Sequence, residues 1–374
     1  MTLASIEPAA AVHTIVHADA LGEACEAWRE RAWLALDTEF VRESTYYPRL
    51  CLIQVADGRG EACIDTLALD AAALRPLLDV LYGPGTKVFH AASQDLEVLL
   101  QLGGAVPQPL FDTQLAAALL GIGDQLGYAA LVERLLDVRL DKSLTRTDWS
   151  RRPLSAAELT YAADDVRYLA QIYPRLQDQL DAAGRLGWLL EDCARMADPE
   201  RYRSPPATAW RRLKGLARLA PPAQRAAAAL AAWREQTAQA RDRPRKWILD
   251  DEPLYRLAER RPHNLAQLES LKLLPPKLLE RHGEALVEQM AQAADTPGPT
   301  GLDAPALTDA QKALARQMAE RVRGEAERLG LPPALLASRG DIETLVREGA
   351  GATLPLLGGW RREVIGEVLL GLAA

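Results

Sequence analysis

Apolar positions in the first half of the chain alternate between a strand-like and a helix-like pattern. Short apolar runs predict strands at residues 12–16, 33–40, 50–56, 62–67, 87–90 and 110–112. Apolar residues at helical spacing predict helices at 21–31, 71–81, 93–100, 113–120, 127–138 and from about 156 onward. The stretch Asp57-Gly58-Arg59-Gly60 predicts a hairpin between two of the strands. Strands that first form a hairpin and then alternate with helices predict a mixed sheet flanked by helices, an α/β fold.

Two of the helix starts carry residues typical of N-termini. Ser93 is predicted as an N-cap, with Asp95 in the first helical turn. Ser155, with Glu158 three residues later, has the capping-box pattern. Both helices therefore have defined start points, and the side chains in their first turns can be placed.

From about residue 195 the chain shows only helical patterns. Pro-rich stretches at 198–206 and a Pro/Gly linker at 294–303 divide this part. The segments on either side of the linker look related, because residues 273–286 resemble residues 356–369 at an offset of 83. A competing register pairs 274–276 with 331–333 at an offset of 57. The predicted domains are an α/β domain at 1–198, a helical domain at 205–293, the linker at 294–303 and a second helical domain at 304–374.

Composition fits a globular protein with a substantial core. Of 374 residues, 48% are hydrophobic and 25% are charged. No apolar run is long enough to span a bilayer, and the N-terminus lacks the basic start of a signal peptide. The four cysteines are far apart, which argues against disulfides or zinc and predicts a reducing, cytoplasmic location without membrane contact.

Charge is unevenly distributed along the chain. The net charge is −7, yet residues 201–260 hold 14 Lys and Arg against 6 Asp and Glu. The rest of the chain then carries 30 positive and 45 negative side chains. Such asymmetry is typical of a basic nucleic-acid-binding patch on an acidic enzyme, the alternative being solvated Arg-rich helix faces.

An acidic pair lies in the strongest predicted strand. Asp37 and Glu39 are two residues apart at the end of an apolar run, so in a strand they point to the same face. Two neighbouring carboxylates repel each other unless a positive charge lies between them. A divalent ion with oxygen ligands, Mg²⁺ or Mn²⁺, would supply it. The alternative is a strand that runs into a solvated acidic turn.

Further along, Asp95, Tyr161 and Asp165 complete a constellation with this pair. Tyr161 and Asp165 are four residues apart on a helix and share a face, whereas Asp164 is rotated by roughly 100°. Each has an ordinary alternative. Asp95 would favour any helix N-terminus, Asp165 could be a solvated helix residue, and Tyr161 a core aromatic residue.

Taken in order, three motifs resemble those of the DEDD 3′–5′ exonucleases: Asp37-Thr38-Glu39, residues 90–95 ending in Asp95, and Tyr161-x-x-x-Asp165. The sister subgroup has His where this chain has Thr160, so the resemblance is to the Tyr subgroup. Additional motifs at 112–114, 140–143, 148–154 and 161–163 look like bacterial ribonuclease D. That family also carries C-terminal HRDC domains, which residues 205–293 resemble and residues 304–374 resemble in diverged form.

The resemblance implies an RNase H-like exonuclease domain that releases 5′-mononucleotides from the 3′ end of RNA. Asp37, Glu39, Asp95 and Asp165 would hold two Mg²⁺ or Mn²⁺ ions. Tyr161 would orient the attacking water, since a phenol with a pKa near 10 is a poor base at neutral pH. Transfer RNA precursors are the implied substrates, and a monomer is expected. A DNA exonuclease of the same superfamily and an inactive RNA-binding protein are the alternatives, although no metal ligand is lost.

Other residues are predicted to contact RNA. Phosphates would be bound by Lys142, Arg146 and Arg152, and a base would stack on Trp149, whose alternative role is to pack the final helix onto the sheet. The strongest basic segment comprises Arg241, Arg243, Arg245, Lys246 and Trp247. His90 is expected to be a core residue with its ring nitrogens satisfied rather than a ligand.

Overall fold

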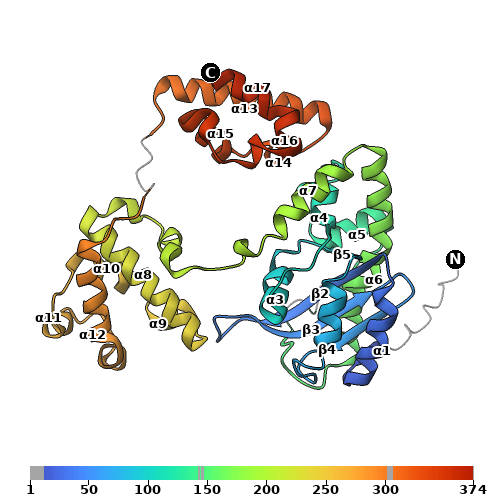
Figure 1. Ribbon diagram of the computed structural model, residues 1–374, viewed down its shortest axis with the longest axis horizontal. Coiled ribbons are helices and arrows are strands. Elements are labelled where there is room, and N and C mark those ends of the chain that lie inside the picture. Colours follow the sequence, from blue (N-terminus) through green and yellow to red (C-terminus); the bar gives the residue numbers. More distant parts are fainter. Residues whose placement is uncertain (1–11, 142–143, 145–146, 301–305, 374) are drawn as a thin grey trace. The chain divides into compact units, whose positions relative to one another are not determined.

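The computed structural model of the chain describes residues 12–141, 144, 147–300 and 306–373. A six-stranded sheet of order β1-β4-β3-β2-β5-β6 forms the first part (Figure 1). Its strands are β1 (His13–Ile15), β2 (Trp33–Val41), β3 (Arg49–Ala56), β4 (Glu61–Asp65), β5 (Thr86–Phe89) and β6 (Leu110–Asp112). The pair β3–β4 is antiparallel, whereas β1–β4, β2–β5 and β5–β6 are parallel. The predicted mixed sheet is confirmed.

The hairpin between β3 and β4 forms where the sequence predicts it. Asp57 accepts hydrogen bonds from the backbone N–H groups of Arg59 and Gly60 at 2.9 and 3.1 Å. Gly58 has a φ of 78°, a conformation that favours glycine. The tight turn fixes the register in which Gln54 pairs with Cys63.

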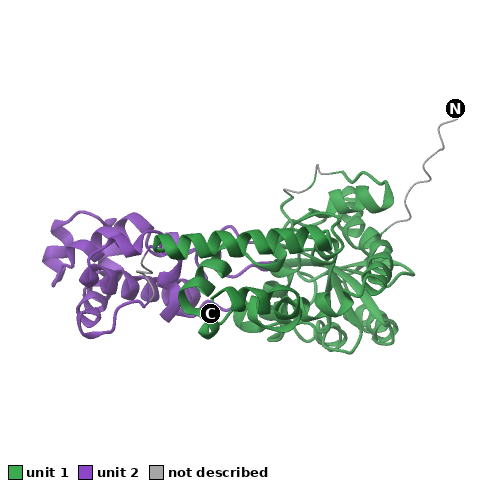
Figure 2. Ribbon diagram, turned by 90° about the horizontal axis from the view of Figure 1, so that it is seen from above, with its two compact units in different colours: residues 1–41, 50–202, 307–374 green, residues 42–49, 203–306 purple. Residues whose placement is uncertain are grey.

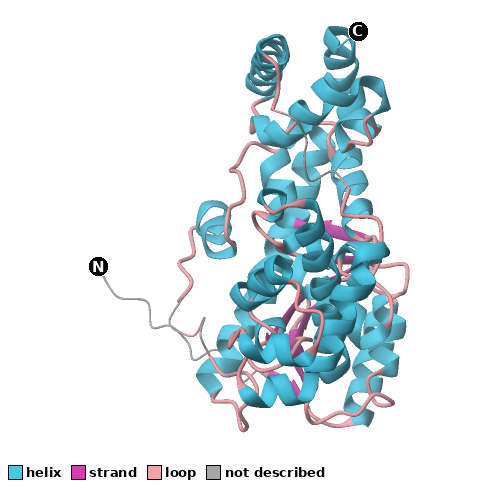
Figure 3. Cartoon of the chain, turned by 90° about the vertical axis from the view of Figure 1, so that its left-hand side faces the viewer, coloured by secondary structure: helices cyan, strands magenta, loops and turns pink. Residues whose placement is uncertain are grey.

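Helices cover the sheet, as Figure 3 shows with strands in magenta and helices in cyan. They are α1 (Ala18–Arg29), α2 (Arg75–Leu81), α3 (Ser93–Gly103), α4 (Thr113–Leu119), α5 (Tyr128–Leu136), α6 (Ala156–Ala182) and α7 (Leu186–Met196). The longest, α6, packs against β2 and β4 and starts with the predicted capping box of Ser155 and Glu158. The predicted cap at Ser93 is wrong, because α3 begins at Ser93 and its N-cap is Ala92.

The described residues after α7 contain no strand. Before the linker lie α8 (Pro221–Arg241), α9 (Arg245–Ile248), α10 (Asp251–Arg260), α11 (Leu265–Ser270) and α12 (Pro276–Gln292). After it lie α13 (Asp309–Leu329), α14 (Pro333–Leu336), α15 (Arg339–Glu348), α16 (Gly359–Arg361), a π-helical turn (Arg362–Gly366) and α17 (Glu367–Ala373). Helices α8, α9 and α10 have 21, 4 and 10 residues, and so do α13, α14 and α15. This succession of lengths repeats at an offset of 88 residues, from Pro221 to Asp309, and the duplication expected at an offset of 83 stays a prediction.

The chain forms two compact units (Figure 2). Residues 307–374 belong to the same unit as the sheet, and residues 42–49 belong to the unit formed by residues 203–306. Within the first unit, the Arg361 guanidinium forms two hydrogen bonds with Asp192 of α7, at 2.5 and 2.9 Å. Trp360 stacks on Trp188 with ring centroids 4.4 Å apart. The last helices are therefore packed directly on α7 of the part of the chain that contains the sheet, a grouping that the sequence did not predict.

Among the helices of the described chain, none combines the length and the apolar character that a membrane crossing requires.

Candidate active site

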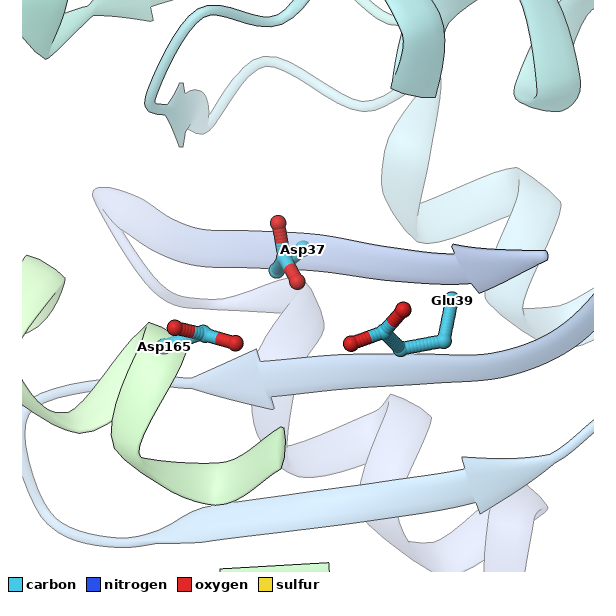
Figure 4. Close-up of side chains that lie close together, drawn as sticks. All are labelled: Asp37, Glu39 and Asp165. Atoms are coloured by element: carbon cyan, nitrogen blue, oxygen red, sulfur yellow. The ribbon is translucent and has the colours of Figure 1, made fainter. Parts of the chain in front are cut away.

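Three of the predicted carboxylates converge above strand β2. Asp37 and Glu39 extend from β2, and Asp165 extends from α6, which covers this strand (Figure 4). One oxygen from each lies within 4.8 Å of the others. The two-residue spacing of Asp37 and Glu39 places both on one face of the strand. The capping box that starts α6 fixes where Asp165 falls on the helix.

The fourth carboxylate, Asp95, lies in the first turn of α3 and is buried. It accepts a hydrogen bond of 2.6 Å from the Thr38 hydroxyl. Thr38 stands between Asp37 and Glu39 in the sequence, so this bond ties α3 to the acidic strand. Asp95 lies outside the three-carboxylate group, but its charge contributes to the raised pKa of Asp37, Glu39 and Asp165.

Burial raises the pKa of all four carboxyl groups, and repulsion from neighbouring carboxylates raises it further. For Asp37 the pKa lies well above its ordinary value, mainly through burial and then through Asp95 and Asp165. Burial, Asp165 and Asp95 raise the pKa of Glu39 to about 8. The pKa values of Asp95 and Asp165 rise to about 7, again with burial as the largest cause. Hard oxygen donors that repel one another are a suitable ligand set for Mg²⁺ or Mn²⁺.

Tyr161 lies one turn before Asp165 on α6. Burial raises the pKa of its phenol, and Asp165, Glu39 and Asp37 raise it further, so the phenol is neutral at physiological pH. Its ring stacks on Trp149 with centroids 6.2 Å apart. A neutral phenol can donate one hydrogen bond and accept another.

A cavity of about 750 Å³ opens beside Tyr161 and Asp165. Its other lining residues are mostly apolar: Gly127, Tyr128, Ala129, Ala130, Leu140, Asp141, Leu144, Ala157, Thr160 and Asp164. The volume falls in the range of small-molecule sites. Of the four site carboxylates, Asp165 lines this cavity, so the acidic group borders a space large enough for a nucleotide at that residue.

The structure corrects two of the predicted RNA contacts. Trp149 is only 4% exposed and packs in a buried cluster with Cys51 and Ala162, which fits its alternative packing role. Arg152 donates to both carboxylate oxygens of Asp65, at 2.5 and 2.8 Å, and to the carbonyl of Cys51 at 2.8 Å. Both side chains anchor the segment before α6 to the sheet, since Trp149 is buried and the Arg152 guanidinium is engaged by Asp65 and the Cys51 carbonyl.

Other predicted RNA contacts are surface residues or lie outside the described part of the chain. Lys142 and Arg146 belong to the residues that are not described. Arg241, Lys246 and Trp247 are exposed, with Trp247 at 62%. In the same segment, Arg243 donates to the carbonyl of Ser44, and Arg245 forms an ion pair with Glu235.

Asp112 is a supporting residue to which sequence reasoning assigned no role. Its carboxylate is buried and caps α4 by accepting from the N–H groups of Gln114 and Leu115 at 2.8 and 3.1 Å. It also accepts from the N–H of Ala92 at 2.9 Å and so holds the start of α3, which carries Asp95. The sequence signal that could have identified it is its position immediately before a predicted helix, where Asp commonly acts as the N-cap.

His90 has the satisfied environment that the sequence predicts. Its ring nitrogens lie 3.0 Å from the Thr113 hydroxyl and 3.0 Å from the Leu126 carbonyl. Burial lowers its pKa. This histidine therefore holds neighbouring loops together and is not oriented toward the carboxylates as a ligand.

Known proteins resemble both parts of the chain. The 3′–5′ exonuclease family model matches residues 12–181, and the HRDC domain model matches residues 223–289. Ribonuclease D of Pseudomonas paraeruginosa is 41% identical over 361 residues, covering 94% of each chain. Ribonuclease D of Xanthomonas oryzae pv. oryzae is 40% identical over 364 residues, covering 94% of this chain and 96% of its own.

A solved structure agrees with these sequence matches. The crystal structure of Escherichia coli RNase D, described as an exoribonuclease involved in structured RNA processing, has a TM-score of 0.85 and 35% identity. It covers 96% of this chain and 98% of that chain. Mixed sheet, acidic site and family models together define a 3′–5′ exonuclease. The chain belongs to the ribonuclease D family, which confirms the predicted enzyme class of 3′–5′ exoribonuclease.

Proposed function

We propose that the chain is a two-metal-ion 3′–5′ exoribonuclease that trims unpaired 3′ ends of structured RNAs, transfer RNA precursors among them, and releases 5′-mononucleotides. The observation that carries this proposal is the convergence of Asp37, Glu39 and Asp165 within 4.8 Å beside a cavity of nucleotide size. All four carboxylates come from one chain, so the site needs no second copy and a monomer suffices.

The ions would be held by Asp37, Glu39, Asp95 and Asp165. When bound, divalent ions activate water and offset charge on the scissile phosphate. The chain itself positions the reactants. Neutral Tyr161 would orient the attacking water through a hydrogen bond, and the apolar cavity wall would hold the terminal base.

The exposed residues Arg241, Lys246 and Trp247 would bind RNA upstream of the 3′ end. Arginine and lysine neutralise phosphates, and an exposed indole offers a stacking surface for a base. This assignment keeps the predicted basic surface but leaves out Arg243 and Arg245, whose guanidinium groups bond to the Ser44 carbonyl and to Glu235.

Matched RNA and DNA duplexes with identical single-stranded 3′ tails test the substrate. We expect faster shortening of the RNA, with no shortening of either by an Asp37→Asn variant that still binds RNA. Equal or faster turnover of the DNA would support a DNA exonuclease instead. Wild-type protein that binds RNA without shortening it would support an RNA-binding protein.

A further inference from the structure

The connection between β2 and β3 folds with the helical unit. Strand β2 ends at Val41 and β3 begins at Arg49. Residues 42–49 nevertheless group with residues 203–306, and Figure 2 gives them the colour of that unit. The helical unit is thus joined to the catalytic strand through this connection as well as through its own flanking segments.

Tyr46 is the anchor of the connection. Its side chain is 5% exposed and packs in a cluster with Ala238 and Ile248. The phenol donates to the buried carboxylate of Glu235. The Arg245 guanidinium lies 4.6 Å from the ring centroid and donates to the phenol oxygen at 2.9 Å. A buried, hydrogen-bonded tyrosine of this kind fixes the connection in one orientation.

Asp242 holds the backbone of the same connection. One of its oxygens accepts from the N–H groups of Tyr46 and Tyr47 at 2.9 and 3.0 Å. Arg243 adds a bond of 3.1 Å to the carbonyl of Ser44. Both Asp242 and Arg243 directly follow α8, so the end of one helix supplies the partners for three backbone groups of the connection.

The segment that grips the connection also presents the predicted RNA-binding residues. Within residues 241–247, Asp242, Arg243 and Arg245 contact the connection, whereas Lys246 and Trp247 are exposed. Tyr46 follows Glu39 by only seven residues, a stretch that spans at most about 25 Å when fully extended. RNA bound on this surface would therefore contact a segment that is linked to the catalytic strand by only a short stretch of chain.

We propose that Tyr46 and Asp242 are positioning residues that couple RNA bound by the helical unit to the strand bearing Asp37 and Glu39. This rests on the proposed function. The contact acts only on substrates long enough to reach both the carboxylates and the segment 241–247. A trinucleotide bound at the carboxylates does not use it.

Kinetics on a trinucleotide and on a stem RNA with a single-stranded 3′ tail test the proposal. For Tyr46→Ala and Asp242→Ala, we expect the KM for the tailed RNA to rise about tenfold as the tether is lost. The kcat and KM for the trinucleotide stay at wild-type values. Tyr46→Phe, which keeps the ring, should give a smaller rise. The control Ser44→Ala changes an exposed side chain and keeps the carbonyl that Arg243 contacts, so it should match the wild type. Parallel losses on both substrates, or no change on either, would overturn the proposal.

Hydrogen exchange provides a readout that does not depend on activity. The amides of Tyr46 and Tyr47 should be protected in the wild type and should exchange faster in Asp242→Ala, because their acceptor is gone. Unchanged exchange would show that the contact is absent in solution and would overturn the proposal. Wild-type protein that degrades neither RNA would overturn the proposed function, while the exchange result would still decide whether the connection is docked.

Discussion

At the scale of single residues, the active site holds four carboxyl groups in surroundings that disfavour their ionised form. Burial is the largest cause of the raised pKa of Asp37, Glu39, Asp95 and Asp165. Their spacing could be predicted from sequence, because strand and helix periodicity determine which side chains share a face. The hydrogen bond from Thr38 to Asp95 could not, because nothing local shows that α3 packs beside β2.

Replacing Asp37 by Asn should separate catalysis from stability. Replacing a residue that only supports a metal ligand typically lowers activity by up to about 100-fold. Because Asp37 would itself be a ligand, its replacement should lower kcat by more than that. Removal of a buried carboxyl group that its acidic neighbours disfavour should raise the melting temperature of the metal-free protein. Product formation and thermal unfolding in EDTA measure the two effects. Wild-type kcat in the variant would contradict the assignment of Asp37.

Metal affinity should depend on pH across neutrality. The pKa of Glu39 is about 8 and that of Asp165 about 7, so protons compete with the ions and affinity should rise from pH 6 to pH 8. In the unfolded chain these groups titrate near pH 4. The folded metal-free protein therefore holds more protons, and its free energy of unfolding should fall as the pH rises from about 4 to 8. Calorimetric Mg²⁺ titrations and unfolding in EDTA test both trends, and a pH-independent affinity would contradict the shared burial of these acids.

At the scale of elements, features that depend on neighbouring residues could be predicted from the sequence, whereas features that depend on distant residues could not. The turn at Asp57–Gly60 and the capping box of Ser155 and Glu158 depend on neighbouring residues, and both are present in the structure. Ser93 was misplaced as a cap because Asp112, twenty residues away, holds the start of α3. The role of Trp149 depends on Cys51, about a hundred residues away, so sequence spacing alone left its packing role as one alternative.

Asp112→Asn should weaken the start of α3 while sparing the cap of α4. The oxygen that accepts from Gln114 and Leu115 remains, whereas an amide nitrogen cannot accept from the N–H of Ala92. We expect a loss of about 1–3 kcal/mol in the free energy of unfolding for the unpaired buried N–H and weaker Mg²⁺ binding through displaced Asp95. Asp198→Asn, at an exposed cap, is the control. Equal effects of the two substitutions on Mg²⁺ binding would contradict this role.

At the scale of the whole molecule, the order of domains along the chain does not match their grouping in space. Residues 307–374 pack with the sheet, and residues 42–49 pack with the helical unit. Pro- and Gly-rich stretches reveal where a chain can be divided, but they do not show which pieces bury surface against each other. The Trp188–Trp360 stack and the Asp192–Arg361 pair join residues far apart in sequence, so no local pattern identifies them.

The packing of the last helices can be tested by comparing Arg361→Ala with the neighbouring substitution Arg362→Ala. Arg361 neutralises Asp192, and both side chains are largely buried, at 12% and 6% exposed. Its loss should lower the free energy of unfolding by about 1–3 kcal/mol, because the buried carboxylate loses two hydrogen bonds but keeps its ion pair with Arg195. The Arg362–Glu367 pair is exposed, so the neighbouring substitution should cost less than about 1 kcal/mol. Urea unfolding compares them, and equal losses would contradict the packing of residues 307–374 on α7.

The central claim is that the carboxylates of β2, α3 and α6 form a metal-dependent exoribonuclease site. Product analysis on a 5′-labelled RNA with an unpaired 3′ tail, in Mg²⁺, Mn²⁺ or EDTA, tests it most directly. The account predicts a ladder that shortens from the 3′ end with either metal, release of 5′-mononucleotides, and no reaction in EDTA. Internal cleavage, shortening in EDTA, or binding without shortening in either metal would contradict it.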